Sequence, residues 1–176
     1  MTERLPPDLS AEPILDTLQR HAVDFVVIGG LAGMAHGSTY PTFDLDVAYS
    51  RDRSNVIRLV AALRELGARL RTPGDEEELP FQLDVRSLEN GANFTFRTRF
   101  GNLDVLADPG GIRSYEKLRA AARDTAIEGA PVLVASMDHL IAMKRTAAKP
   151  KDKIMVEEYI ALAEEQRRLE GNGESS

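Results

Sequence analysis

Two periodicities alternate along the chain, one of about 3.6 residues and one of about two residues. The longer period predicts helices with one buried face, and the shorter period, together with short apolar runs, predicts strands. Helices are expected over residues 12–21, 31–36, 55–66, 113–123, 137–147 and 151–169. Strands are expected over residues 23–28, 44–49, 94–99, 103–107 and 132–135. Residues 71–92 show no clear period and are expected to form an acidic loop and a short ambiguous segment.

This order of elements predicts an α/β fold with a mixed β-sheet flanked by helices and a C-terminal helical portion. We expect an α/β core over residues 11–135, with helices of residues 136–170 packed on it. Residues 1–10 are expected to be a flexible N-terminus and residues 171–176 a disordered tail. At 176 residues and 43% hydrophobic content, the chain is long enough to bury one core.

Composition narrows the function classes. The chain has no cysteine, which excludes disulfide and thiolate chemistry. No apolar run approaches the roughly 20 residues of a membrane helix, and the first ten residues are charged and contain proline, unlike a signal peptide. We therefore expect a cytoplasmic protein without a membrane partner. The net charge of −6 argues against a general nucleic-acid binder, although local basic patches remain possible.

Two carboxylates lie one residue apart in a predicted strand. The alternation in Asp44-Leu45-Asp46-Val47 places both aspartates on one face and the apolar residues on the other. Carboxylates this close repel each other, and a hard divalent cation relieves the repulsion. Mg²⁺ is usually held by one or two carboxylates, waters and substrate phosphates, so the pair predicts a site for Mg²⁺ or Mn²⁺ carrying a nucleoside triphosphate (NTP). The alternative is a solvated strand edge.

Two glycines end the preceding strand. Gly29 and Gly30 follow Val27-Ile28 and precede the expected short helix. Glycines at such a position let backbone N–H groups approach phosphate oxygens at a helix N-terminus. A Gly-Gly pair by itself is typical of an ordinary turn, and only its combination with the carboxylates indicates a phosphate site.

A third carboxylate, Asp104, lies between apolar residues in the strand expected over 103–107. A charged group on an otherwise buried strand needs a partner. In a metal site, Asp104 would help to hold a second cation and assist deprotonation of the attacking hydroxyl. In two-metal phosphoryl chemistry, two cations about 3.5–4 Å apart stabilise the entering and leaving oxygens. The alternative is an aspartate at a strand end that faces water.

Lys144 takes an apolar position in the helix expected over 137–147, where Leu140 and Ile141 set the buried face. It either packs its stem and extends its ammonium to water, or points into the cleft and binds the triphosphate as a point charge. Asp152, at the start of the last helix, is either a first-turn acid favoured by the helix dipole or a member of the same site.

Together these motifs resemble the DNA polymerase β-like nucleotidyltransferase superfamily, in which Gly-Gly or Gly-Ser precedes a carboxylate pair on the next strand. Their order is more specifically similar to the AbiEii-type nucleotidyltransferase family, which includes the MenT-type toxins of bacterial toxin–antitoxin systems. The resemblance covers roughly residues 12–165. It rests on Val27-Ile28-Gly29-Gly30, Ala35-His36-Gly37, Thr42-x-Asp44-Leu45-Asp46, Thr98-Arg99-Phe100-Gly101-x-Leu103-Asp104, Tyr115-x-x-Leu118, Leu140-Ile141-Ala142-Met143-Lys144-Arg145 and Lys149-Pro150-Lys151-Asp152.

The resemblance implies a minimal nucleotidyltransferase fold and a role for each matching residue. The metal ligands that it implies are Asp44, Asp46 and Asp104. The implied catalytic set is Asp44, Asp46, Asp104, Lys144 and Asp152. The implied nucleotide-binding set is Gly29, Gly30, Thr42 and Lys144.

The implied activity is Mg²⁺-dependent transfer of a nucleoside monophosphate (NMP) from an NTP to an acceptor. For a MenT-like toxin the acceptor is the 3′ end of tRNA, and an antitoxin protein is the expected partner. Two alternatives stay open. One is nucleotidylation of a protein or a small molecule, and the other is a non-catalytic binding module that keeps the fold.

Overall fold

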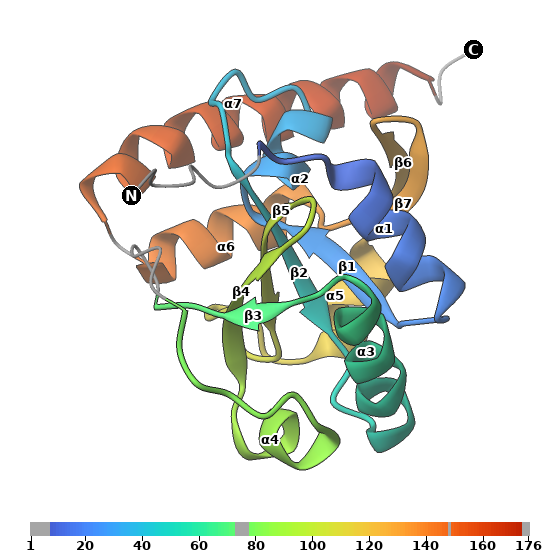
Figure 1. Cartoon of the computed structure of the whole chain (residues 1–176). Helices are drawn as coiled ribbons and strands as arrows, with labels where there is room; N and C mark the ends of the chain where they lie inside the picture. Colours follow the sequence, from blue (N-terminus) through green and yellow to red (C-terminus); the bar gives the residue numbers. More distant parts are fainter. Residues whose placement is uncertain (1–7, 73–77, 148, 174–176) are drawn as a thin grey trace.

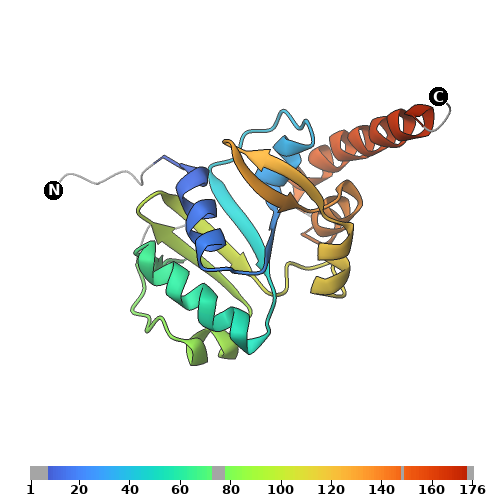
Figure 2. The ribbon, with the colours of Figure 1, turned by 90° about the vertical axis from the view of Figure 1, so that its right-hand side faces the viewer.

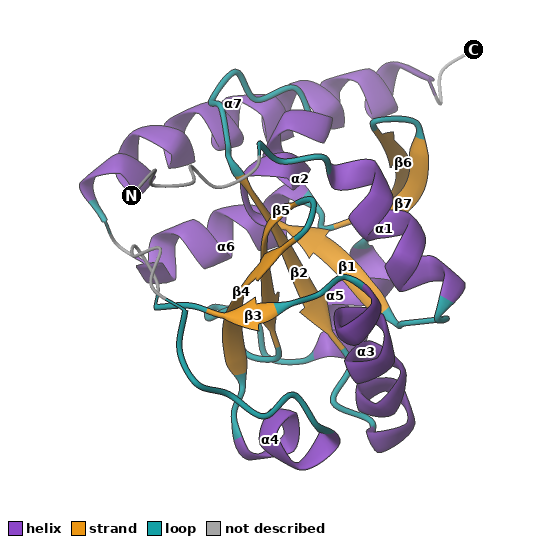
Figure 3. Ribbon diagram, viewed as in Figure 1, coloured by secondary structure: helices purple, strands orange, loops and turns teal. Residues whose placement is uncertain are grey.

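A computed structural model describes residues 8–72, 78–147 and 149–173 (Figure 1). Within these residues, strands and helices alternate irregularly along the chain (Figure 3). The strands are β1 (Phe25–Ile28), β2 (Asp44–Tyr49), β3 (Arg69–Leu70), β4 (Asn93–Thr98), β5 (Gly101–Leu106), β6 (Arg123–Ile127) and β7 (Ala130–Val134). The helices are α1 (Ala11–Arg20), α2 (Gly29–Ala35), α3 (Arg53–Glu65), α4 (Val85–Asn90), α5 (Tyr115–Ala121), α6 (Met137–Ala147) and α7 (Pro150–Gly173).

The described strands form one sheet in the order β3-β4-β5-β2-β1-β7-β6. β2 pairs in parallel with β5 and antiparallel with β1, so the sheet is mixed. β4 and β5 form a hairpin, with Thr98 opposite Gly101. The structure thus confirms the predicted α/β fold. No helix in the described part of the chain is long and apolar enough to cross a membrane.

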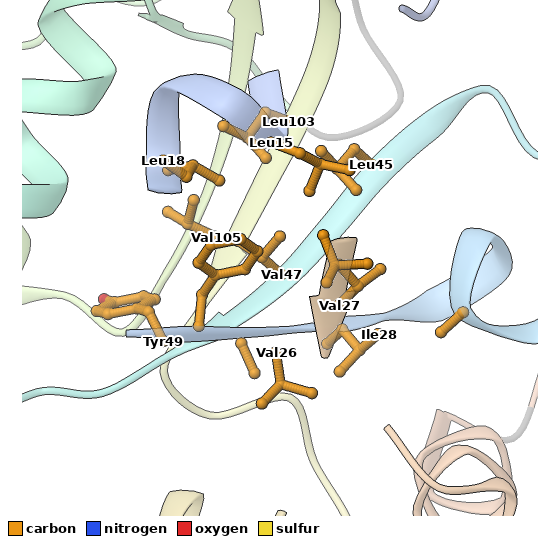
Figure 4. Close-up of a cluster of buried hydrophobic side chains, with 14 of the residues drawn as sticks. Leu15, Leu18, Val26, Val27, Ile28, Leu45, Val47, Tyr49, Leu103 and Val105 are labelled. Carbon is orange, nitrogen blue, oxygen red and sulfur yellow. The ribbon is translucent and has the colours of Figure 1, made fainter. Parts of the chain in front are cut away.

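The two faces of the sheet have different roles. Helices α1 and α3 lie on one face, whereas α6 and α7 lie on the other (Figure 2). The first face carries a large part of the hydrophobic core, in which Leu15 and Leu18 of α1 lie over Leu45, Val47 and neighbouring strand residues (Figure 4). Because strand side chains alternate, a core on this face turns the polar residues of β2 and β5 toward α6 and α7.

Three elements were not expected from the sequence. β3 has only two residues, too few for a visible period. α4 begins after Asp84, whose side chain accepts a hydrogen bond from the Ser87 backbone N–H at 2.8 Å, a capping pattern that the sequence does contain. β6 is mostly polar because it is an edge strand with one exposed side.

The predicted helix over 113–123 is shorter than expected, since α5 spans Tyr115–Ala121 and Arg123 already belongs to β6. β6 and β7 form a hairpin closed by Glu128 and Gly129, which have φ angles of 51° and 84°. Two positive φ angles give the two-residue turn whose twist matches that of paired strands.

The structure describes part of each predicted chain end. α7 continues to Gly173, so residues 171–173, where the sequence predicted the start of a disordered tail, are helical. Residues 174–176 lie outside the described residues, as do residues 1–7 of the predicted flexible N-terminus and residues 73–77 of the predicted acidic loop. Ser10 is described, and its backbone N–H donates to the Phe100 carbonyl at 2.8 Å.

A buried asparagine joins α3 to the ends of β1 and β2. The Asn55 side-chain oxygen accepts from the Asp24 backbone N–H at 2.7 Å. Its amide donates to the carbonyls of Asp24 and Ser50 at 3.0 and 2.8 Å. These bonds hold the start of β1 and the end of β2 together and fix the connection between β2 and α3; the Asp24 carbonyl also accepts from the Ser50 backbone N–H at 3.3 Å.

We predict that Asn55→Ala lowers the free energy of unfolding by about 2 kcal/mol, because it removes the side-chain partners of the partly buried Asp24 N–H and of the buried Ser50 carbonyl. Urea denaturation followed by circular dichroism measures this loss. Ser54→Ala, at the exposed neighbouring position, is the control and should change stability little. Equal stability of the two variants would contradict the role assigned to Asn55.

Candidate active site

One row of residues crosses the sheet and places the predicted carboxylates side by side. Asp46 of β2 lies opposite Asp104 of β5 and opposite Ile28 of β1. On its other side, Asp104 lies opposite Thr95 of β4. Residues directly opposite in paired strands point to the same face. Asp46 and Asp104, which are 58 positions apart in the sequence, therefore share one small volume on the face turned toward α6 and α7.

Gly29 borders this volume so closely that no side chain could take its place. Its φ is +68°, and an added Cβ would collide with the carboxylate of Asp46. Gly29 and Gly30 form the first turn of α2 rather than preceding the helix, which starts two residues earlier than predicted. An added Cβ at Gly30 would collide with Thr42, so both glycines allow α2 to approach the strand that carries the carboxylates.

The surroundings of Asp46 and Asp104 disfavour the state in which both carboxyl groups are ionised. The pKa of Asp46 is raised well above its ordinary value, first by burial, then by the charge of Asp104 and a hydrogen bond to it, and then by Asp44. The pKa of Asp104 is also raised, mainly by burial. Arg71 opposes the shift at Asp104 and Lys144 opposes it at Asp46. Without a cation, the pair is most stable when it shares a proton.

A lysine–aspartate pair on α6 and α7 forms the opposite wall. The Lys144 ammonium donates to Asp152 Oδ1 at 3.1 Å, and the Asp152 side chain is only 9% exposed. The other Asp152 oxygen accepts from the Lys149 backbone N–H at 3.3 Å. Lys144 is therefore held in place by Asp152 and does not extend freely into water. Asp152 is a buried partner of Lys144 as well as a first-turn acid.

A pocket of about 330 Å³ lies between these two walls. Its size is at the lower end of the range for small-ligand sites. Five of the predicted site residues line it, namely Gly29, Asp46, Asp104, Lys144 and Asp152. The other three, Gly30, Thr42 and Asp44, are not part of its lining. Asp44 lies one row further along β2, opposite Asn102, and Thr42 Oγ1 donates to its carbonyl at 3.3 Å.

Arg71 is a residue of this site that the sequence interpretation missed. Its side chain is only 6% exposed, and its Nη2 lies 3.7 Å from Asp104 Oδ1 and 3.9 Å from Asp44 Oδ2. It follows the two-residue strand β3 in a segment without a clear period. No motif in the sequence marks it, because only the pairing of β3 with β4 brings it beside carboxylates from β2 and β5.

Tyr159 adds a second polar group that was not predicted. Its hydroxyl is buried and has no hydrogen-bond partner among the described residues. It packs against Gly33 of α2, where an added Cβ would collide with it, and it belongs to the pocket lining. Burial raises its pKa to about 12, so the hydroxyl stays protonated and available as a donor.

The donor set suits a divalent cation in its chemistry, since carboxylate oxygens are the ligands that Mg²⁺ and Mn²⁺ prefer. Asp104 Oδ1 is also a buried oxygen that has no hydrogen-bond partner among the described residues. Within the described ranges, however, no three His, Asp or Glu side chains converge as a ready-made metal cluster. Asp46 and Asp104 are adjacent, while Asp44 is 41% exposed and paired with Arg71. The assignment of all three carboxylates as metal ligands stays a prediction.

Comparisons with known proteins identify the fold. No sequence model of a protein family matches the chain, and no curated protein matches it in sequence. Among solved structures, the chain is similar to the lincosamide antibiotic adenylyltransferase LnuA in its lincomycin-bound form. The TM-score is 0.59 at 12% identity, and the match covers 88% of this chain and 99% of that chain.

Two further solved structures are also similar to this chain in fold. ANT(2″)-Ia in complex with adenylyl-2″-tobramycin matches with a TM-score of 0.53 at 20% identity, over 90% of this chain and 95% of that one. A candidate nucleotidyltransferase from Thermotoga maritima matches with a TM-score of 0.52 at 14% identity, over 86% and 90%. At such low identities the likeness establishes the fold alone. The chain has the nucleotidyltransferase fold that its motifs predicted.

We predict that Asp46→Asn stabilises the protein at pH 7.5 in the presence of EDTA, by on the order of 1 kcal/mol. The pKa of Asp46 is raised on folding, so the folded state binds more protons than the unfolded state above the ordinary aspartate pKa. Stability then falls as the pH rises toward the folded pKa, and an amide removes this penalty. The gain should disappear near pH 3, below the ordinary aspartate pKa of 3.8, where the carboxyl is protonated in both states.

Urea denaturation at the two pH values measures this difference. Asp138→Asn, at a carboxylate that is 78% exposed, serves as the matched control and should show no gain at either pH. A variant that is less stable than the wild type at pH 7.5 would rule out the proposed charge repulsion.

Proposed function

We propose that this protein is a metal-dependent nucleotidyltransferase, which moves an NMP from an NTP to an acceptor hydroxyl. The observation that carries the proposal is the pairing of Asp46 with Asp104 on one wall of a pocket whose other wall holds Lys144. The nucleotidyltransferase fold supports it, because the carboxylates lie on the central strands of that fold. A non-catalytic module has no need to keep two mutually repelling carboxylates in a pocket.

Asp46 and Asp104 are the residues that would hold a divalent cation, with Asp44 at the edge of the same face. Such a cation neutralises the two carboxylates, orients the triphosphate and stabilises the charge that develops on its oxygens. Replacing the shared proton of the pair by a cation removes the repulsion between the carboxylates. The binding of metal and nucleotide is therefore expected to depend on pH.

The remaining residues act on the nucleotide and on the acceptor. The acceptor oxygen attacks the α-phosphorus, the bond to the β-phosphate oxygen breaks, and pyrophosphate leaves. The Asp104 carboxylate accepts the proton of the attacking hydroxyl. Lys144, positioned by Asp152, is a point charge for the triphosphate and for the leaving pyrophosphate. Gly29 leaves room for the phosphates beside Asp46.

The first acceptor to consider is the 3′ end of tRNA. The order of motifs resembles AbiEii-type enzymes, including MenT-type toxins, and this resemblance supports a toxin of a toxin–antitoxin system with a cognate antitoxin as its partner. A protein that modifies tRNA in this way would act in the cytoplasm. The role of Asp44, Asp46, Asp104, Lys144 and Asp152 as the catalytic set is part of the same proposal, as is nucleotide binding by Gly29, Gly30, Thr42 and Lys144.

A small-molecule acceptor is the second candidate. Two of the similar structures are named for antibiotics, one bound to lincomycin and one to adenylyl-2″-tobramycin. The net charge of −6 also suits a small or cationic acceptor better than a polyanion such as tRNA. Nucleotidylation of a protein is a variant of this proposal.

We predict that the protein transfers label from an α-³²P-NTP to its acceptor in the presence of Mg²⁺. Asp46→Ala and Lys144→Ala should each lower the rate by about 100-fold or more, because one removes a carboxylate of the metal pair and the other a charge on the phosphates. The four NTPs are tested separately with total tRNA, with aminoglycosides and lincosamides, and with cell protein. Gel electrophoresis and thin-layer chromatography separate the labelled products.

Lys117→Ala and Asp138→Ala are the matched controls, since both remove an exposed charge outside the pocket. Label on the tRNA 3′ end supports the toxin proposal, and label on an antibiotic supports the second candidate. If no acceptor is labelled but NTP binding needs Mg²⁺, the acceptor lies outside these classes. The absence of any NTP binding would contradict the proposed enzyme and favour a non-catalytic module.

A further inference from the structure

The face of the sheet that carries Asp46 and Asp104 also carries the buried guanidinium of Arg71, which has no part in the chemistry proposed above. Thr95 lies opposite Asp104, and Leu70 lies opposite Phe96, so continuing this register places Arg71 opposite Thr95. Arg71 therefore extends the row of Asp46 and Asp104 across the sheet. It occupies the end of this row on the β3 side, whereas Lys144 approaches the carboxylates from α6.

The distances place the guanidinium between two carboxylates without bonding it to either. Its Nη2 is 3.7 Å from Asp104 and 3.9 Å from Asp44, which is within ion-pair range but longer than a hydrogen bond. Its Nε is buried and has no hydrogen-bond partner among the described residues. A buried arginine normally makes close bidentate bonds to a carboxylate. Arg71 instead lies at a distance where it acts mainly through its charge.

The position of Arg71 is fixed by its backbone. Its N–H donates to the Thr95 carbonyl at 3.0 Å, and it forms an antiparallel bridge with Glu78. The side chain is 6% exposed, so leaving the carboxylates would require either a move of this segment or the loss of its counter-charges. A second divalent cation between Asp44 and Asp104 would have to share the volume and the ligands of this guanidinium.

We propose that Arg71 takes the place of a second divalent cation, so that the protein binds its nucleotide with a single metal ion. The inference rests on the proposed nucleotidyltransferase function and specifies how its site is charged. When Asp44, Asp46 and Asp104 are ionised, one divalent cation and the Arg71 guanidinium balance their three charges, whereas two divalent cations beside Arg71 would exceed them. The metal binds at the Asp46–Asp104 pair, and the Arg71 guanidinium balances the charge of Asp44.

Arg71 is then a positioning and charge-compensating residue. An arginine side chain is a permanent cation, and its five donors suit phosphate oxygens. Unlike a metal ion, it cannot lower the pKa of a bound hydroxyl by coordination, so deprotonation of the acceptor depends on Asp104. A purely structural arginine would neutralise the same carboxylates but would not limit the number of metal ions.

The number of bound metal ions tests this directly. We predict that the wild-type protein, with a non-hydrolysable α,β-methylene NTP analogue, binds one Mn²⁺ per chain, counted by electron paramagnetic resonance and by calorimetric titration. Arg71→Met, which keeps much of the side-chain length and removes the charge, should bind two. Without nucleotide, the same variant should bind Mn²⁺ about tenfold more tightly than the wild type, because the carboxylates lose their internal cation.

Arg69→Met is the matched control, because Arg69 lies two residues earlier and its side chain is 70% exposed. It should bind one Mn²⁺ with wild-type affinity. If Arg71→Met does not fold, Arg71→Gln is used instead, because it retains a hydrogen-bonding group without the charge. Arg71→Gln should also bind two Mn²⁺ ions. The rise in melting temperature on adding Mn²⁺ should also be larger in either neutral variant than in the wild type.

Each outcome decides the proposal. Two Mn²⁺ ions in the wild type would overturn the role of Arg71 and leave the proposed transferase standing. One Mn²⁺ in the neutral variants, with unchanged affinity, would also overturn it, since Arg71 would then be a structural residue only. A wild-type protein that binds neither Mn²⁺ nor the analogue would instead contradict the proposed nucleotidyltransferase function itself.

Discussion

The in-register parallel pairing of β2 with β5 is the constraint on which the site depends. It sets Asp46 beside Asp104 and, by the same alternation, sets Leu45 and Val47 beside Leu103 and Val105 in the core. A shift of one residue would turn the carboxylates of one strand into the core and its apolar residues toward the pocket. The hydrophobic face thus fixes the register, and the register brings the carboxylates together.

The same pairing places a destabilising feature in the middle of a stable sheet. Asp46 and Asp104 are brought together although burial raises the pKa of both, and the charge of Asp104 raises the pKa of Asp46 further. The surrounding structure provides partial compensation on two sides, with Arg71 from the segment after β3 and Lys144 from α6. Stored electrostatic energy of this kind is typical of functional sites, because a bound cation or substrate releases it.

The helices α6 and α7 complete the pocket and hold its second charge. Lys144 is oriented by Asp152 across the junction of the two helices, so the position of the cation depends on how α6 meets α7. Tyr159 packs its hydroxyl, which finds no hydrogen-bond partner in the described part of the chain, against Gly33 on the side of the pocket bordered by α2. The two walls therefore differ in chemistry, with a pair of carboxylates on the sheet and the donors Lys144 and Tyr159 on the helices, where Asp152 is the partner of Lys144. Such a division suits a phosphate-bearing ligand bound through a cation.

The sequence by itself determined the α/β class, the mixed order of elements and most of the pocket. Alternation identified the faces of β2 and β5, and the isolated charges at Asp104 and Lys144 stood out because apolar neighbours surround them. Only the tertiary structure decided that Asp44 lies outside the pocket lining, that Lys144 is held by Asp152, and that Arg71 belongs to the site. β3 is too short to show a period, and Arg71 is placed by hydrogen bonds to a strand more than twenty positions away in the sequence. Local patterns report which face of an element is buried, whereas the meeting of charges from distant segments depends on strand order and register, which no local pattern contains.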